Sequence, residues 1–247
     1  MDTTERPVAL VTGAARRVGR VIARTLHGAG YDLALHYRGS RAEAEQLACE
    51  LEAKRTGSTL ILQAELADPA APDALVRQTV QRFRRLDALV NNASSFFPTP
   101  VGETTQAHWD ELFAANARAP YFLAQAAAPH LKRVRGAIVN LVDIYATQPL
   151  ARHPVYCMAK AALAMATRAL AHELGPEIRV NAVAPGAVLW PEAGKSAEQQ
   201  QALIGRSALK RAGTPEDVAV AVLFLLRDAG FTTGEILKVD GGRTLAS

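Results

Sequence analysis

Short apolar runs alternate with segments of helical periodicity along the whole chain. The runs are VALVTG, DLALHY, TLILQAE, DALVNN, GAIVNLVD, IRVNAVAPG and EILKVDGG. Between them, apolar residues recur at helical spacing over residues 18–29, 41–54, 73–85, 105–132, 154–174 and 214–228. Continuously apolar runs are typical of strands that are covered on both faces of a parallel sheet. The pattern therefore predicts an α/β protein with a doubly wound, seven-stranded parallel sheet.

One segment interrupts this alternation. Residues 187–207 carry Trp190 and Pro191 before a polar helical stretch, and no linker, repeat or low-complexity tract divides the rest of the chain. We expect a single domain over residues 1–247, with an insertion at about 187–207 over one end of the sheet. Ligands of such sheets bind outside the carboxyl ends of the strands, so the residues that follow each strand are the candidates for function.

Composition narrows the classes of function. The 247 residues are 49% hydrophobic, but no run reaches the length of a membrane span and the N-terminus shows no signal pattern. We expect a cytoplasmic protein without membrane contact. The formal net charge is +4, yet Lys and Arg are scattered rather than gathered into an arm, which argues against nucleic-acid binding. Cys49 and Cys157 are far apart and predict neither a disulfide framework nor a metal site.

A glycine-containing loop, TGAARRVG at residues 12–19, joins the first strand to the first helix. Glycines there let the backbone approach a pyrophosphate, whose charge is favoured at a helix N-terminus. The second strand ends at His36-Tyr37, followed by Arg38 and Ser40 and by no acid. An acid at this point would hold the ribose hydroxyls of NAD and repel a 2′-phosphate, which Arg and Ser bind. The sequence predicts an NADP(H) site; the alternative is a solvated basic loop.

Two side chains with catalytic chemistry share one helical face. Tyr156 and Lys160 are four residues apart in the predicted helix 154–174. A nearby ammonium stabilises a phenolate, so we expect Lys160 to lower the pKa of Tyr156 and make it a proton donor. Asp143 ends the fifth predicted strand, thirteen residues before Tyr156. Its alternative role is to cap a turn or helix.

These motifs resemble those of the short-chain dehydrogenase/reductase family, whose patterns are TGxxxGxG, NNAG and YxxxK. The chain departs from them in three places: Arg17 replaces the middle glycine of the loop, Ser94 replaces the glycine of NNAG, and Asp143 replaces a serine. With the segments TGAARRVGR, NNASSFFPTP and VDIYATQPL, these departures resemble the pteridine reductases of that family. The resemblance spans nearly the whole chain and is weakest over 187–207.

The resemblance implies a Rossmann-type fold and NADPH-dependent reduction of a pterin to its tetrahydro form, with a dihydropteridine, dihydromonapterin or a dihydrofolate-like molecule as substrate. It implies that Tyr156, with Asp143 beside it and Lys160 behind, passes a proton to a ring nitrogen next to the carbon that accepts hydride. Asn116 would hold a water in a proton relay; its alternative is an interior amide bonded to backbone. An ionised Asp143 would repel a developing alkoxide, which disfavours ketone chemistry.

The site residues follow from the loop motifs and the resemblance together. Flat rings stack on aromatic side chains, so Phe96 is expected to cover the substrate, with plain packing as its alternative, an alternative that Leu189 and Trp190 share. No metal is expected. The predicted cofactor-binding residues are Gly13, Arg16, Arg17, Val18, His36, Arg38, Ser40, Glu65, Leu66, Asn92, Ala93, Ser94, Lys160, Pro185 and Gly186. The predicted substrate-binding residues are Arg17, Ser94, Phe96, Asp143, Tyr156, Leu189 and Trp190.

Other functions and an assembly are also implied. The same fold can reduce a ketone or a 3-oxoacyl thioester, and a regulator can bind NADPH without turnover. The regulator would be expected to lose Tyr156 or Lys160, and both are present. The resemblance implies a homotetramer, and the alanine-rich, weakly charged helices 105–132 and 154–174 suit burial between subunits.

Overall fold

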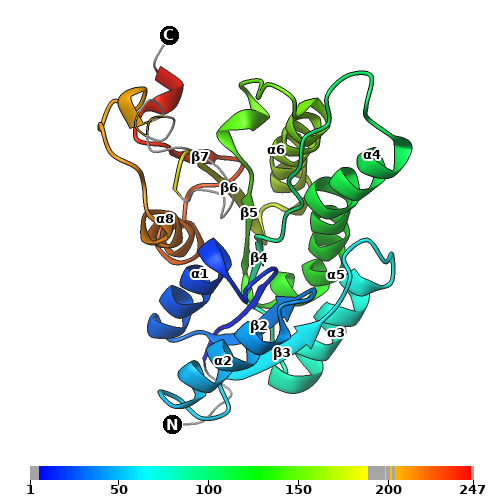
Figure 1. Cartoon of the computed structure of the whole chain (residues 1–247). Helices are drawn as coiled ribbons and strands as arrows, with labels where there is room; N and C mark the ends of the chain where they lie inside the picture. The colour runs from blue at the N-terminus through cyan, green and yellow to red at the C-terminus, as the bar shows by residue number, and fades with distance from the viewer. Residues whose placement is uncertain (1–5, 189–197, 199–200, 202–203, 246–247) are drawn as a thin grey trace.

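The computed structural model describes residues 6–188, 198, 201 and 204–245. Seven strands form one sheet in the order β3-β2-β1-β4-β5-β6-β7, and every neighbouring pair is parallel (Figure 1). The predicted Rossmann-type, doubly wound fold is therefore confirmed. The strands are β1 (Val8–Val11), β2 (Asp32–Tyr37), β3 (Thr59–Gln63), β4 (Ala88–Asn91), β5 (Ala137–Leu141), β6 (Arg179–Pro185) and β7 (Ile236–Val239).

The helices agree with the predicted segments except in one place. They are α1 (Arg17–Gly28), α2 (Arg41–Glu52), α3 (Ala71–Phe83), α4 (Gln106–Phe113), α5 (Ala119–Val134), α6 (Pro154–Leu174) and α8 (Pro215–Arg227). Short helical segments occur at η1 (Ala114–Arg118, a π-helix), η2 (Ile144–Ala146) and η3 (Arg243–Leu245).

The helix predicted over 105–132 is present from Gln106 to Val134, but it is not α-helical throughout, because a π-helical segment lies between α4 and α5. Pro120 explains the interruption. It has no N–H to donate to the carbonyl of Asn116, four residues earlier, so the α-helical hydrogen-bond pattern cannot run through this point. The break places Asn116 inside the π-helical segment.

Apolar side chains fill both faces of the sheet. One cluster joins it to α1, α2 and α8 and includes Ile22, Leu47 and Val222. A second cluster joins the opposite face to α3, α5 and α6 and includes Leu75 and Leu123. Every residue of β1, β2, β4 and β5 is buried, which is the physical reason why these strands read as continuous apolar runs.

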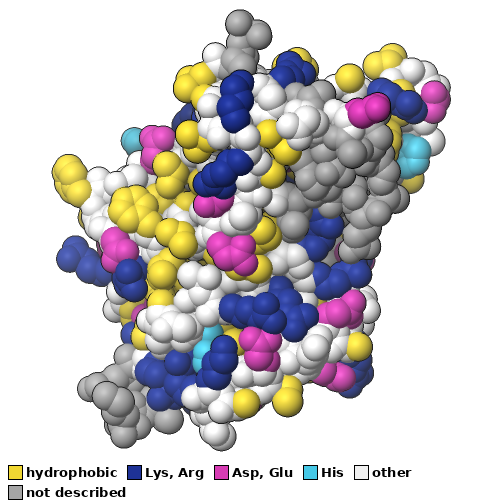
Figure 2. Space-filling view, turned by 60° about the vertical axis from the view of Figure 1, so that its left-hand side comes forward, with side chains coloured by type: hydrophobic (Ala, Val, Ile, Leu, Met, Phe, Trp, Pro, Cys, Tyr) yellow, Lys and Arg dark blue, Asp and Glu magenta, His cyan; other side chains and the backbone are white. Residues whose placement is uncertain are grey.

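Most charged side chains lie on the surface of the molecule; Asp32 and Lys160 are buried. In Figure 2, Lys and Arg are spread over the visible face and interspersed with Asp and Glu. Several of them form ion pairs, such as Arg24 with Glu50 at 2.6 Å and Arg41 with Glu45 at 2.8 Å. Among the described residues, no helix has both the length and the apolar character needed to cross a membrane.

The loop between β1 and α1 packs too closely for side chains at its glycines. Gly13 has a φ of +63°, and a Cβ there would lie 3.0 Å from the Cα of Ala93. A Cβ on Gly19 would lie 2.1 Å from the carbonyl oxygen of Gly13 and 2.6 Å from Nδ2 of Asn92. The start of α1 is thus pressed against the loops that follow β1 and β4.

This contact can be tested with two substitutions in one helix. Gly19→Ala should destabilise the fold by about 2–3 kcal/mol, because backbone must move to admit the methyl group. Gly28→Ala is the matched control, since no atom lies within 4 Å of its Cβ position, and it should be neutral or stabilising by up to about 1 kcal/mol. Urea denaturation measures both, and equal stabilities of the two variants would contradict the close packing.

Candidate active site

A cleft of about 760 Å³ opens at the carboxyl ends of the strands. This volume lies within the range of small-molecule and cofactor sites. The structure gathers most of the predicted cofactor residues there: Gly13, Arg16, Arg17, Val18, His36, Arg38, Ser40, Glu65, Leu66, Asn92, Ala93 and Ser94. Tyr156 lines the same cleft. The residues that the sequence reasoning missed are Ala15, Gly19, Tyr37, Gly39, Glu43, Ser95 and Ala115, most of which adjoin predicted ones.

Thr12, which the sequence reasoning did not single out, ties two of the cleft loops together. Its hydroxyl oxygen accepts hydrogen bonds from the backbone N–H groups of Asn92 at 2.9 Å and Ala93 at 3.0 Å. Nδ2 of Asn92 donates in return to the carbonyls of Thr12 and Gly13, at 2.9 and 3.1 Å. The segment after β4 is therefore fixed relative to the glycine loop.

Arg17 occupies a backbone conformation that favours glycine. Its φ is +54°, and a left-handed conformation costs a side-chain-bearing residue about 1–2 kcal/mol. A glycine at this position, as in the pattern TGxxxGxG, would avoid that cost. The Arg17 side chain is exposed and lines the cleft, so its guanidinium is accessible to a ligand there.

The far end of the cleft offers cationic and hydroxyl groups. Arg38 lies 3.9 Å from the carboxylate of Glu65, and both side chains are more than half exposed, so this pair binds weakly. Ser40 precedes α2, but its hydroxyl makes no capping hydrogen bond. Both side chains can therefore contact an anionic ligand. Glu65 also accepts the N–H of Ala67 at 3.1 Å, and Leu66 beside it is buried.

His36 does not present a free ring nitrogen to the cleft. The side chain is 1% exposed, its Nδ1 accepts the N–H of Gly13 at 3.1 Å, and its Nε2 lies 3.1 Å from the carbonyl of Ala64. Burial lowers the pKa of His36. Direct contact of His36 with a cofactor stays a prediction, and such a contact would not use the ring nitrogens, because both are bonded within the protein.

Asp143 and Tyr156 form the centre of the candidate active site. Asp143 follows β5; its Oδ1 accepts the N–H of Tyr145 at 3.0 Å, and its Oδ2 accepts the hydroxyl of Tyr156 at 2.8 Å. Asp143 is thus both the cap of η2 and a partner of Tyr156. Lys160, one turn further along α6 and 2% exposed, donates to the carbonyl of Leu141 at 2.8 Å.

The electrostatics of this group overturn one expectation. Burial raises the pKa of Tyr156 well above its usual value, and the carboxylate of Asp143 raises it further. The pKa of Tyr156 is therefore raised and not lowered as expected, because the phenol is buried and faces an acid directly. Burial also raises the pKa of Asp143 and lowers that of Lys160 to about 8. The carboxyl of Asp143 and the phenol of Tyr156, which are hydrogen-bonded to each other, thus both have a raised pKa.

The side chain of Asn116 is fully engaged by protein groups. Its Nδ2 donates to the carbonyls of Ser95 at 2.9 Å and Leu112 at 3.0 Å, and its Oδ1 accepts the hydroxyl of Ser94 at 2.7 Å. These bonds fit the interior-amide alternative and anchor the segment after β4. A role of Asn116 in a proton relay stays a prediction.

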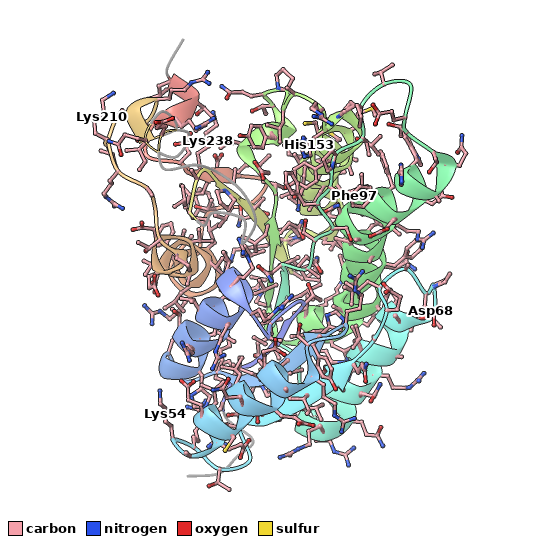
Figure 3. The ribbon with its side chains drawn as sticks, in the orientation of Figure 1. Lys54, Asp68, Phe97, His153, Lys210 and Lys238 are labelled. Atoms are coloured by element: carbon pink, nitrogen blue, oxygen red, sulfur yellow. The ribbon has the colours of Figure 1, made fainter. Side chains whose placement is uncertain are left out.

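Phe96 forms a wall beside the tyrosine. It is 50% exposed, its ring lies 4.8 Å from that of Tyr156 at 83°, and it stacks on His153 at 4.6 Å and 9°. His153 was missed from the sequence, where a lone histidine before Pro154 carries no signal. Figure 3 shows Phe97 and His153 at the upper end of the molecule, opposite Lys54. Phe96 is therefore not a buried core side chain.

Six predicted residues are not among the described residues that line the cleft: Phe96, Asn116, Asp143, Lys160, Pro185 and Gly186. Pro185 and Gly186 lie at the end of β6, where Gly186 donates to the carbonyl of Val239 at 2.9 Å. A Cβ on Gly186 would come within 2.8 Å of Asp240, so the glycine allows close packing of the β6 and β7 ends. Leu189 and Trp190 lie outside the described residues.

The chain is similar to known reductases over nearly its full length. A family model described as enoyl-(acyl carrier protein) reductase matches residues 13–244. Pteridine reductase 1 of Leishmania tarentolae is 38% identical over 97% of this chain and 96% of its own. A 3-oxoacyl-(acyl carrier protein) reductase of Staphylococcus aureus is 35% identical over 95% and 96%. L-xylulose reductase of Caenorhabditis elegans is 36% identical over 98% and 96%.

The electrostatic coupling of Asp143 and Tyr156 can be measured directly. Asp143→Asn removes the negative charge that opposes ionisation of the phenol, so the pKa of Tyr156 should fall. Nuclear magnetic resonance of ¹³Cζ-labelled tyrosine follows the titration. Tyr31 is the internal control, since burial raises its pKa and the acids that add to that rise are Asp87 and Asp228, not Asp143. An unchanged Tyr156 titration would show that Asp143 does not govern it.

Proposed function

Because the chain belongs to the short-chain dehydrogenase/reductase family, whose reductases use NAD(P)H, we propose that it reduces a pterin with NADPH. The substrate is a dihydropteridine, dihydromonapterin or dihydrofolate-like ring, converted to its tetrahydro form. The observation that carries the proposal is the 2.8 Å hydrogen bond from Tyr156 to Asp143. The similarity to pteridine reductase 1 supports it.

The cleft residues fit NADP(H). Arg38 and Ser40 would hold the 2′-phosphate, and the glycine loop with Arg16 and Val18 the pyrophosphate. Glu65 and Leu66 would flank the adenine, and Asn92, Ala93 and Ser94 the linker towards the reacting ring. Lys160 would contact the nicotinamide ribose, and Pro185 and Gly186 the carboxamide. When bound, the cofactor supplies the hydride.

The proton in this proposal comes from the pair of Tyr156 and Asp143. In the structure the Tyr156 hydroxyl donates to Asp143. In the proposed step that hydroxyl turns to give its proton to a ring nitrogen, and a protonated Asp143 carboxyl then donates to the phenolate oxygen, reversing the direction of the bond between the two side chains. Burial raises the pKa of Asp143 above its usual value, which is the direction that this transfer needs. The Lys160 ammonium, anchored on Leu141, would stabilise a developing phenolate from behind.

Two further side chains suit a flat heteroaromatic ring. Phe96 offers a half-exposed aromatic face next to Tyr156, against which such a ring can stack. The Arg17 guanidinium, held in the cleft despite its backbone conformation, would donate to a ring carbonyl or a deprotonated ring nitrogen. Leu189 and Trp190 would complete the wall of this substrate site.

The proposal includes a homotetramer. Large apolar side chains are exposed on consecutive helices: Trp109 on α4, Tyr121 and Phe122 on α5, and Met158 and Met165 on α6. An extended apolar surface on these helices supports burial between subunits, as the resemblance implies.

A second candidate is the reduction of a 3-oxoacyl thioester, which the similarity to the Staphylococcus aureus reductase supports. That chemistry needs a hydrogen-bond donor on the substrate carbonyl. Both oxygens of Asp143 accept hydrogen bonds within the protein, from the N–H of Tyr145 and the hydroxyl of Tyr156, so Asp143 does not offer the donor that a serine at this position would give to a substrate carbonyl. A regulator that binds NADPH without turnover would not need the Tyr156–Lys160 pair.

Turnover decides between these functions. We expect NADPH oxidation with dihydrobiopterin, dihydromonapterin or dihydrofolate, NADPH to be preferred over NADH, and little oxidation with a generic ketoester. Asp143→Ser should lower kcat for the pterin by about 100-fold or more, since general acid catalysis contributes at least that much. Turnover with the ketoester alone, kept or improved by Asp143→Ser, would assign the second candidate. No turnover with any substrate would favour the regulator.

Replacement of Arg17 by glycine should affect stability and activity in opposite directions. Arg17→Gly relieves the left-handed backbone and should leave the melting temperature unchanged or higher, while it lowers pterin turnover by about tenfold or more. Arg84→Gly is the matched control, because Arg84 has a φ of +64° at the end of α3 and does not line the cleft. It should gain the same stability with normal turnover. Equal activity of both variants would remove Arg17 from the substrate site.

A further inference from the structure

We propose that His36 is a positioning residue that sets the affinity for the dinucleotide by clamping the glycine loop to the end of β3. The inference concerns cofactor binding and does not depend on which substrate is reduced. It rests on hydrogen bonds that join three consecutive strand ends through one buried imidazole.

The hydrogen bonds fix the tautomer of the ring. The N–H of Gly13 can only donate, so Nδ1 of His36 must carry a lone pair. Nε2 then carries the proton and donates to the carbonyl of Ala64. Two backbone hydrogen bonds reinforce the link that the His36 ring makes between Gly13 and Ala64. The N–H of Ala14 donates to the carbonyl of His36 at 2.9 Å, and the N–H of Ala64 donates to the carbonyl of Tyr37 at 3.1 Å.

This clamp determines which groups of the loop remain for a ligand. The N–H of Gly13 is used by His36 and does not point to a phosphate. The loop conformation that the bond holds has Gly13 at a φ of +63°, packed against Ala93. From there the chain leads directly to Arg16 and Arg17, which line the cleft. Losing the bond would leave the half-buried N–H of Gly13 without its partner in the protein and let the loop shift.

The same ring connects two walls of the cleft. Nδ1 holds the glycine loop on one side, and Nε2 holds Ala64, which directly precedes Glu65 and Leu66 on the other. A dinucleotide that spans both walls depends on their spacing. Loss of the imidazole should therefore weaken cofactor binding.

His27 provides a matched control. It is also a buried histidine, 3% exposed, with a pKa that burial lowers and a 2.9 Å hydrogen bond from Nε2 to the hydroxyl of Ser58. It does not line the cleft. Replacing it should lower stability as replacement of any buried hydrogen-bonded side chain does, without touching the loop.

The test uses the full-length protein without substrate and measures the Kd of NADPH by calorimetry, with melting temperatures alongside. His36→Leu should raise the Kd about tenfold, as expected when the half-buried N–H of Gly13 loses its partner and the loop is no longer held. His36→Asn places an amide oxygen near the Nδ1 position to accept the Gly13 N–H, and should recover most of the affinity. His27→Leu should keep the Kd of the unmodified protein while its melting temperature falls.

A Kd for His36→Leu equal to that of the unmodified protein, with a melting temperature lowered as in His27→Leu, would reduce His36 to a structural residue. If His36→Leu does not melt cooperatively, His36→Asn decides alone: normal affinity supports the clamp, and affinity lost although the variant is folded contradicts the role of the Gly13 bond. Failure of pterin turnover would leave all of these outcomes unchanged.

Discussion

Parallel pairing of all seven strands is the constraint on which the cleft depends. Each crossover helix returns the chain to the same end of the sheet, so the residues that follow successive strands meet at one edge (Figure 1). Gly13, His36, Ala64 and Asn92 come from four strand ends and are linked by hydrogen bonds across that edge. An antiparallel strand among β1 to β4 would send its end to the opposite side and open this network.

Burial then gives the catalytic groups their chemistry. Tyr156 donates to Asp143, and Lys160 donates to the carbonyl of Leu141, two residues before Asp143. All three side chains are buried, which disfavours the charged form of each. Burial raises the pKa of the carboxyl and of the phenol and lowers that of the amine, and the direct bond from Tyr156 to Asp143 places the acid and the phenol on one proton path. Water would weaken this electrostatic coupling, and the low exposure of Tyr156 and Lys160 limits the access of water.

The sequence predicted what depends on local pattern. Strand number, sheet type and the loop at residues 12–19 follow from apolar periodicity and glycine placement, and the structure agrees. The π-helical segment around Asn116 was not predicted, although Pro120, which lacks a backbone N–H, is a local signal for it. The raised pKa of Tyr156 and the inward role of His36 could not be read from spacing, because both arise from contacts between strand ends that are distant in the chain.

A crystal structure of the protein with NADP⁺ and a dihydropterin tests most directly whether Tyr156 and Asp143 supply the proton, because it locates the ring relative to these two side chains. We expect the pterin ring to lie beside Phe96, with a ring nitrogen within about 2.6–3.2 Å of the Tyr156 hydroxyl, the distance that proton transfer requires. A ring bound with its nitrogens turned away from Tyr156 and Asp143, or held outside the cleft, would contradict the proposal that these two residues supply the proton.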